Sequence, residues 1–174
     1  MINRRVILAG LLTATVAACG QSVDVSPTVA AQARVEKVVV NMASFQGVEG
    51  RQLSVSPDQV QADVTASVES LLKQSSASGT TPVTVTIYPI VVRLISPGQS
   101  LVAGGVSTLT AQIEMVATNG EVLVPRQQVK TTGQDIAGAG LIGAATRGTA
   151  QADYDKTIRR FGESVNAQLF EPEV

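Results

Sequence analysis

Alternating hydrophobic and polar positions predict four strands in the part of the chain that follows the first 34 residues. Residues 35–42 form one alternating run, and residues 83–95 form a second whose alternation shifts at Pro89. Because proline cannot donate to a strand ladder, Pro89 predicts a bulge or an edge strand there. Residues 106–131 predict a hairpin that turns at Asn119-Gly120, the pair preferred for a type I′ turn.

Two segments instead have the spacing of amphipathic helices. The first follows Ser56, Pro57 and Gln59, which together have the pattern of a helix start with a capping box. Its apolar stripe is Val60, Val64, Val68, Leu71 and Leu72, and that of residues 150–169 is Tyr154, Ile158, Phe161, Val165 and Leu169. The predicted order β-α-β-β-β-α indicates an α+β (mixed α/β) domain, with a mixed sheet and two helices on one face.

The first residues have the pattern of a bacterial lipoprotein signal. Arg4 and Arg5 precede an apolar run at 6–18, which is shorter than the roughly 20 residues that a spanning helix needs. The run ends in Val16, Ala17, Ala18 and Cys19, which resembles a lipobox. This resemblance implies cleavage after Ala18 and lipidation of Cys19. We therefore expect a signal peptide at 1–18, a flexible tether at 19–33 and a single domain at 34–174.

The lipid on Cys19 would anchor the protein to a membrane, since two or more acyl chains hold stably. Gly20 stands where the resembling lipoproteins carry Asp if they are retained at the inner membrane. This residue favours the outer membrane, with the domain on the periplasmic face. Arg4 and Arg5 also look like part of a twin-arginine signal, which is the minor alternative for export.

Composition narrows the chemistry that we expect. The chain has no His, and Cys19 is its single Cys, so the usual zinc sites and Ser-His-Asp or Cys-His pairs cannot be built. Aromatic residues make up 3% of the chain, and the formal charge of −1 becomes about −3 without Arg4 and Arg5. These values argue against nucleic-acid binding. We expect no catalytic residues, no metal and no cofactor.

Two short motifs are chance matches on this interpretation. Residues 138–143 read GAGLIG, the spacing of a dinucleotide-binding turn, but no second strand follows to supply a ribose-binding acid. We therefore expect no nicotinamide cofactor. Ser70 and Lys73, with Lys130 to Gly133, faintly resemble boxes of penicillin-binding enzymes, yet Ser70 lies far along its helix. Lys73 is expected to pair with Glu69 instead.

The order of elements resembles that of a group of small bacterial envelope lipoproteins. The resemblance rests on the strand VVVNMASF, the capped helix and the segment LTAQIEMVATNGEVL, although the Asp frequent before the turn in that group is missing. Members have a domain like the amino-terminal domain of TolB, the curli-secretion lipoprotein and the penicillin-binding-protein activator lipoproteins. The resemblance implies a non-enzymatic accessory or scaffold role in envelope assembly, secretion or transport, with another envelope protein as partner.

Three surfaces could carry such a partner: the sheet face without helices, a strand edge, or the uncharged segment 136–145. Burial under the last helix is the alternative explanation for 136–145. A carboxylate-dependent envelope hydrolase remains an alternative function, although Asp153 and Asp155 at i, i+2 do not face each other on a helix. Binding of a small apolar ligand is the third.

Overall fold

The computed structural model describes residues 25–96, 98, 106–131 and 148–171. The elements follow the order α1 (Pro27–Gln32), β1 (Ala33–Val40), η1 (Met42–Ser44), β2 (Val48–Glu49), α2 (Pro57–Ser75), β3 (Thr81–Arg93), β4 (Thr108–Ala117), β5 (Val122–Lys130) and α5 (Ala150–Phe170). This confirms the predicted α+β class, and it adds α1, η1 and the short strand β2 to the predicted elements. No helix of these residues has the length and apolar character required to cross a bilayer.

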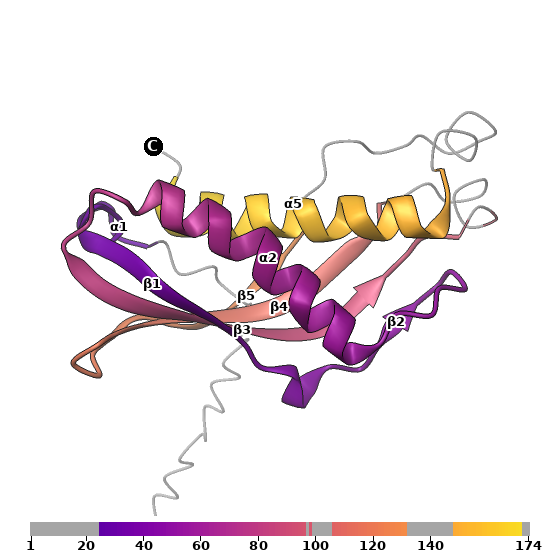
Figure 1. Cartoon of the computed structure of the whole chain (residues 1–174), viewed down its shortest axis with the longest axis horizontal. Helices are drawn as coiled ribbons and strands as arrows, with labels where there is room; N and C mark the ends of the chain where they lie inside the picture. The colour runs from indigo at the N-terminus through magenta and orange to yellow at the C-terminus, as the bar shows by residue number, and fades with distance from the viewer. Residues whose placement is uncertain (1–24, 97, 99–105, 132–147, 172–174) are drawn as a thin grey trace, which may run out of the picture.

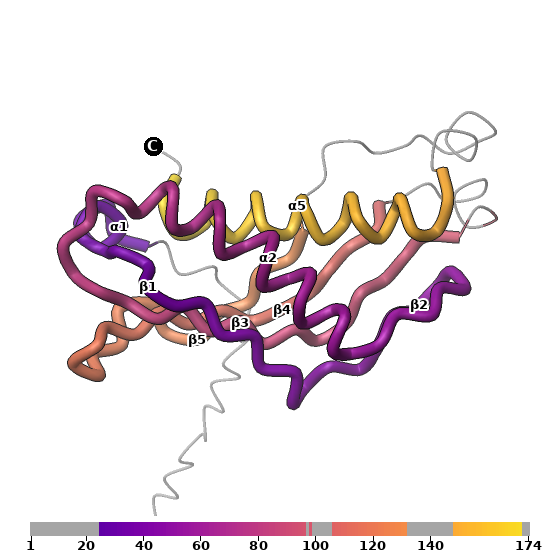
Figure 2. The backbone as a smooth tube through the Cα atoms, viewed as in Figure 1, coloured from indigo at the N-terminus to yellow at the C-terminus, as the bar shows by residue number. Residues whose placement is uncertain are grey.

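The sheet is mixed and has helices on one side. Its strand order is β1-β3-β4-β5, and β2 continues along the same edge of β3 beyond the end of β1. Strands β1 and β2 run parallel to β3, whereas β3, β4 and β5 are antiparallel neighbours. Figure 1 shows α2 and α5 crossing on one face of this sheet, and the tube in Figure 2 follows the same two layers.

The core lies between the sheet and the two long helices. On β4 every second residue is buried, and on α2 the buried residues recur at every fourth position. The predicted apolar sets of β4 and α5 are buried: Leu109, Ala111, Ile113, Met115, Ala117, Tyr154, Ile158, Phe161, Val165 and Leu169. Packing of these apolar faces therefore fixes which side of the sheet the helices cover.

Side-chain caps start both long helices. The Ser56 hydroxyl accepts from the backbone N–H of Gln59 at 3.1 Å, as predicted. Only this half of the capping box forms, and the Gln59 side chain is directed toward Asp63, where its Nε2 donates to Oδ1 at 2.7 Å. Thr149 caps α5 in the same way, accepting from the N–H of Ala152 at 3.1 Å.

The hairpin between β4 and β5 differs from the type I′ prediction. A type I′ turn needs positive φ at both Asn119 and Gly120, but only Gly120 has it, at 89°. Gly120 N–H donates to Ala117, and Ala117 N–H donates to Glu121, so three residues form the loop. This geometry is that of a type I turn followed by a glycine bulge. A two-residue loop predicts that Val122 pairs with Ala117 and Val124 with Met115. The longer loop instead pairs Val122 with Val116, while the pair of Met115 and Val124 is confirmed.

Pro89 lies in the central strand β3 and marks a bulge. The pairing with β4 shifts between Pro89 and Val91, which leaves Ile90 as the extra residue. Pro89 also lies beyond the last β1 pair, at Ile87, and before the first β2 pair, at Val92. The ring therefore interrupts neither parallel ladder. Of the two predicted alternatives, the bulge is confirmed.

The packed domain begins before the expected boundary at residue 34. Val25 is buried, the Ser26 hydroxyl accepts from Val29 N–H at 3.3 Å, and Pro27 is the first residue of α1. The expected flexible tether at 19–33 therefore includes a short capped helix in its described part. Capping and burial of Val25 explain the difference, since a composition rich in small polar residues carries no signal of either.

Helices α2 and α5 approach closely where they cross. Ser67 Oγ donates to the carbonyl of Ile158 at 3.1 Å. Gly162 faces the same serine, and a Cβ there would lie 2.6 Å from Ser67 Oγ and 2.9 Å from its carbonyl oxygen. Glycine is therefore required at this crossing by close backbone approach. The crossing also forms one end of the groove described below.

Candidate functional surfaces

The sheet face opposite the helices is the first candidate surface, called here the open face. In the part of the chain that the structure describes, no helix packs on it. Its rows follow from the register: Lys37, Thr84 and Val116 form one, and Tyr88, Gln112 and Gln128 form another. Residues on β3 and β4 are half-buried by their neighbours, whereas those on β1 and β5 are mostly exposed.

A cluster of three side chains lies at the centre of the open face. The Tyr88 hydroxyl on β3 donates to Glu114 Oε2 on β4 at 3.2 Å. The guanidinium of Arg126, on β5, lies over the Tyr88 ring with Cζ 3.6 Å from its centroid. This is a cation–π contact that reaches across the intervening strand. The cluster therefore fixes an aromatic ring and a planar cation in a solvent-facing position.

Basic side chains exceed available carboxylates on this face. Arg34 pairs with Glu36 at 2.9 Å, and Arg93 pairs with Glu49 at 3.0 Å. Among the described residues, no carboxylate lies within 4.0 Å of Lys37, Arg126 or Lys130. The open face thus carries three cations without an acidic partner in the described part of the chain.

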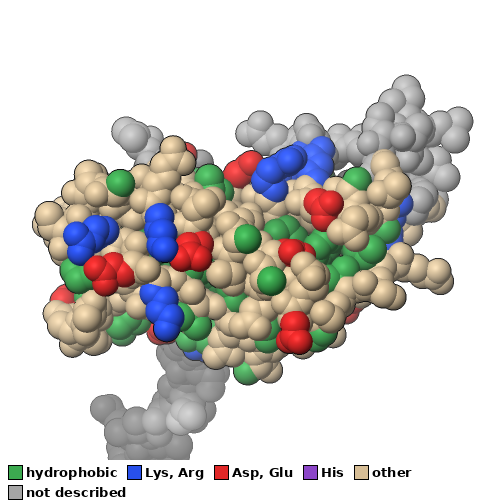
Figure 3. All heavy atoms as spheres, viewed as in Figure 1, with side chains coloured by type: hydrophobic (Ala, Val, Ile, Leu, Met, Phe, Trp, Pro, Cys, Tyr) green, Lys and Arg blue, Asp and Glu red, His purple; other side chains and the backbone are tan. Residues whose placement is uncertain are grey.

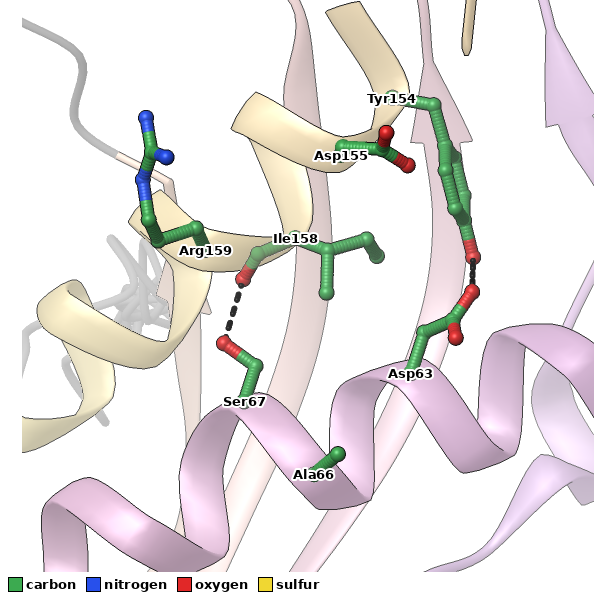
Figure 4. A pocket seen from close by; sticks show the side chains of 7 residues that line it. All are labelled: Asp63, Ala66, Ser67, Tyr154, Asp155, Ile158 and Arg159. Atoms are coloured by element: carbon green, nitrogen blue, oxygen red, sulfur yellow. Dashed lines mark hydrogen bonds between the residues drawn. The ribbon is translucent and has the colours of Figure 1, made fainter. Parts of the chain in front are cut away.

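A groove between α2 and α5 is the second candidate. Its volume is about 370 Å³, and its lining residues are Asp63, Ala66, Ser67, Tyr154, Asp155, Ile158 and Arg159. A neighbouring hollow of about 480 Å³ shares Asp63, Tyr154 and Asp155 with it. The close view in Figure 4 shows Tyr154 reaching from α5 to Asp63 on α2, with Asp155 beside them and Arg159 extending away from α2.

Hydrogen bonds already engage the acidic groups of this groove. The Tyr154 hydroxyl donates to Asp63 Oδ2 at 2.9 Å, and Gln151 Nε2 donates to Asp155 Oδ1 at 2.7 Å. Burial raises the pKa of the Tyr154 hydroxyl well above its ordinary value, and the Asp63 carboxylate raises that pKa further. Tyr154 is therefore a proton donor to Asp63 throughout the physiological range and not a base.

The outer surface over the helices is mixed in character. Figure 3 shows basic and acidic side chains interspersed on this face, with hydrophobic side chains at the surface between the two helices. The apolar part of the groove lining, Ala66 and Ile158, belongs to this region. The groove therefore suits a small ligand that is partly apolar, rather than a polyanion.

Asp153 connects the start of α5 to Ser107 and Arg51 and does not line the groove. Its Oδ2 accepts from Ser107 Oγ at 2.7 Å and lies 3.7 Å from Arg51 Nη1. Arg51 Nη2 also donates to the carbonyl of Gly148 at 3.1 Å, and Ser107 Oγ accepts from Ile95 N–H at 3.0 Å. With side chains of Arg51 and Asp153 exposed by 13% and 12%, this cluster has a structural role at the start of α5.

The structure places the residues of the sequence hypotheses as follows. Ala18, Cys19 and the segments 138–143 and 136–145 lie outside the described residues. Asp153 and Asp155 serve different contacts, as their i, i+2 spacing predicts. Lys73 Nζ lies 2.6 Å from Glu69, which confirms that pair.

The structure does not bring together the residues that faintly resemble the boxes of penicillin-binding enzymes. Ser70 is on α2, on the helix side of the sheet, whereas Lys130 is at the end of β5 on the open face. No group of three potential metal ligands among His, Cys, Asp and Glu occurs within the described residues.

The Tyr88–Glu114–Arg126 cluster was not predicted from the sequence. Alternation places Tyr88 and Glu114 on the polar side of their strands, which was the available signal. Arg126 reaches Tyr88 because the pairing of β4 with β5 shifts between Ile113 and Met115. Such a shift depends on packing that no local pattern encodes.

Comparisons with known proteins include a weak structural likeness. No family model matches the chain, and no curated protein matches it. The chain is similar to the crystal structure of protein XCC0632 from Xanthomonas campestris, described under the family DUF330, with 13% sequence identity and a TM-score of 0.37. The similarity covers 79% of this chain and 83% of that one, and at this level it supports no inference about function.

Proposed function

We propose that this chain is a lipid-anchored envelope lipoprotein whose domain faces the periplasm and binds another envelope protein. It acts as a non-enzymatic accessory or scaffold in assembly, secretion or transport. The lipobox-like VAAC segment supports the location, with Cys19 as the lipidated residue and Gly20 favouring the outer membrane. The TolB-like and activator-lipoprotein resemblance noted from the sequence remains a prediction.

The observation that carries the binding role is the open face. A sheet face that is only exposed to solvent needs no more than polar side chains such as threonine and lysine. This one instead holds an arginine on a tyrosine ring at its centre, with a tyrosine–carboxylate hydrogen bond beside it. Tyrosine and arginine are enriched where protein interfaces concentrate their binding energy.

Cell fractionation of a Cys19→Ala variant tests the anchoring. We expect the variant to lose acyl mass and to leave the membrane fraction or remain unprocessed, because acyl chains are the proposed attachment. The matched control is Ser22→Ala in the expected tether, which should stay in the membrane fraction. Wild-type protein that is wholly soluble and carries no acyl group on Cys19 would refute the proposal.

The α2–α5 groove supports a second candidate function, the binding of a small, partly apolar ligand. Its lining combines Ala66 and Ile158 with the Tyr154–Asp63 pair. A carboxylate-dependent hydrolase would use the same groove, with Asp63 and Asp155 as its two carboxyls. Hydrolysis assays on envelope glycans with the Asp63→Asn and Asp155→Asn variants would separate these alternatives. A hydrolase would lose its activity in either variant while the fold is retained, whereas a binding protein would show no hydrolysis in any form.

A further inference from the structure

We propose that the open face binds an acidic segment of the partner protein, with Arg126 on its Tyr88 platform as the principal contact. This inference rests on the proposed function, because it gives the chemistry of the partner. The segment would present a carboxylate to the Arg126 guanidinium.

Arg126 is held in position by the Tyr88 ring but keeps its hydrogen-bond donors. Its guanidinium stacks at 3.6 Å over the Tyr88 ring, which uses the face of the group and not its N–H edges. Among the described residues, no acceptor is bonded to these N–H groups. A planar cation with free edges fits a carboxylate with two parallel hydrogen bonds. Because the ring restrains the side chain, less conformational entropy is lost on binding.

The charge around Arg126 is basic on balance. Glu114 keeps its negative charge while it accepts from Tyr88, and Glu36 and Glu49 are paired with arginines. Five cations among the described residues of this face outnumber these three carboxylates: Arg34, Lys37, Arg93, Arg126 and Lys130. Lys37 and Lys130 lie at opposite sides of the same face without acidic partners among the described residues. Charge complementarity therefore favours a partner surface with several carboxylates.

The open face also carries an apolar pair, Val116 and Val122, in the row that contains Lys37. Val122 is 54% exposed, and it pairs across the sheet with the half-buried Val116. Val116 in turn neighbours Thr84, which pairs with Lys37. An apolar side chain of the partner can cover these two valines while its carboxylates meet the basic groups. This arrangement has an apolar contact with charged surroundings, as protein interfaces do.

A protein segment fits this face better than an anionic membrane does. Three carboxylates, Glu36, Glu49 and Glu114, are interspersed with the basic groups. A protein segment can place its carboxylates opposite the cations alone, whereas a continuous layer of lipid phosphates would also meet these three carboxylates and be repelled by them. Addition of a strand to the β5 edge is also disfavoured, because Pro125 lacks an N–H and the register shifts beside it. The partner segment is therefore expected to lie across the face rather than to extend the sheet.

Photo-crosslinking in intact cells tests this proposal with the full-length, anchored protein. A photoreactive amino acid replaces Gln128, which is exposed and lies in the Tyr88 row of the open face. A second protein carries it in place of Ser70, which is exposed on α2. We expect the Gln128 position to give one major protein adduct, with the crosslinked peptide rich in Asp and Glu, and the Ser70 position to give none of it.

Charge changes then identify the contact. Arg126→Glu should reduce the adduct at least tenfold, and Arg126→Lys should reduce it less. Lys73→Glu, the matched reversal of charge on the helix side, should leave it unchanged. Reversal of the crosslinked acidic residue to Lys in the partner should restore the adduct with Arg126→Glu. Thermal melting of each variant shows whether the fold is kept.

Several outcomes would overturn the proposal. An adduct that Arg126→Glu does not reduce, a crosslinked segment without acidic residues, or adducts with lipid alone would each reject it. A protein adduct from the Ser70 position alone would reject this surface but leave the proposed accessory function standing. An absence of protein adducts from both positions would count against both proposals.

Discussion

Replacement of Gly162 by alanine tests the crossing of α2 and α5, on which the groove depends. The new methyl group would lie 2.6 Å from Ser67 Oγ and 2.9 Å from the Ser67 carbonyl oxygen. Rotation of the serine relieves the first contact, but the second involves backbone and requires the helices to separate. The Gly162→Ala change should therefore destabilise the domain even though alanine is the better helix former.

The magnitude follows from three contributions. Overpacking of a tight contact costs about 1–3 kcal/mol. Loss of the Ser67–Ile158 hydrogen bond, which is 3.1 Å long, costs about 1 kcal/mol more. The higher helix propensity of alanine offsets about 1 kcal/mol of this loss. The net loss in the free energy of unfolding is thus about 1–3 kcal/mol, which lowers the melting temperature by roughly 3–10 °C for a domain of this size.

Calorimetry or circular dichroism of the purified, anchor-free domain measures the effect. The matched control is Ala62→Gly on the exposed side of α2, outside the groove lining, which should cost only the propensity difference of about 1 kcal/mol. A Ser67→Ala change combined with Gly162→Ala should recover part of the loss, because the hydroxyl contact is removed while the carbonyl contact remains. A Gly162→Ala domain as stable as the wild type would refute the described crossing.

Two further changes test local features of the fold. Tyr154→Phe should cost about 1–2 kcal/mol at neutral pH through the lost bond to Asp63. Because the raised pKa keeps Tyr154 protonated in the folded state, the wild type should lose stability as pH rises above about 10, where the unfolded tyrosine ionises. Denaturant titrations across that range should show a shallower loss for the phenylalanine variant, and equal slopes would contradict this explanation. Gly120→Ala should cost about 1 kcal/mol in the same titrations, because φ at this position is 89°, whereas no change would exclude the glycine bulge.

Sequence patterns predicted the elements whose signals are local and repeated. The stripe Val60, Val64, Val68 and Leu72 and the alternation from Leu109 to Ala117 both correspond to buried faces, since burial against one layer imposes a fixed period. Leu71, which was predicted in the same stripe, is half-buried. Ser56 likewise identified the start of α2 through a cap that spans only three residues. For such features, the physical cause and the pattern lie in the same short segment.

The features that were missed or altered depend on context outside the segment. The type of turn at Asn119-Gly120 depends on the φ of Asn119, for which the dipeptide allows either sign. The helix α1 is fixed by burial of Val25, a tertiary contact within a composition typical of tethers. The groove likewise depends on the angle at which α2 and α5 cross. Gly162 allows their close approach, but a glycine in a helix does not by itself predict such a crossing.

The contrast between the two faces of the sheet connects these observations to function. On the helix side, every second residue of β4 is buried, so packing alone accounts for the residues found there. On the open face the fold requires little beyond polarity, and threonine, glutamine or lysine meets that requirement at several positions, such as Thr84, Gln112 and Lys130. The pair of Arg126 and Tyr88 is more specific than polarity requires. A cation–π pair on an exposed surface contributes only about 0.5–1 kcal/mol to stability, so folding alone gives little reason for it. A site whose chemistry is more specific than folding needs is where recognition of a partner is best sought.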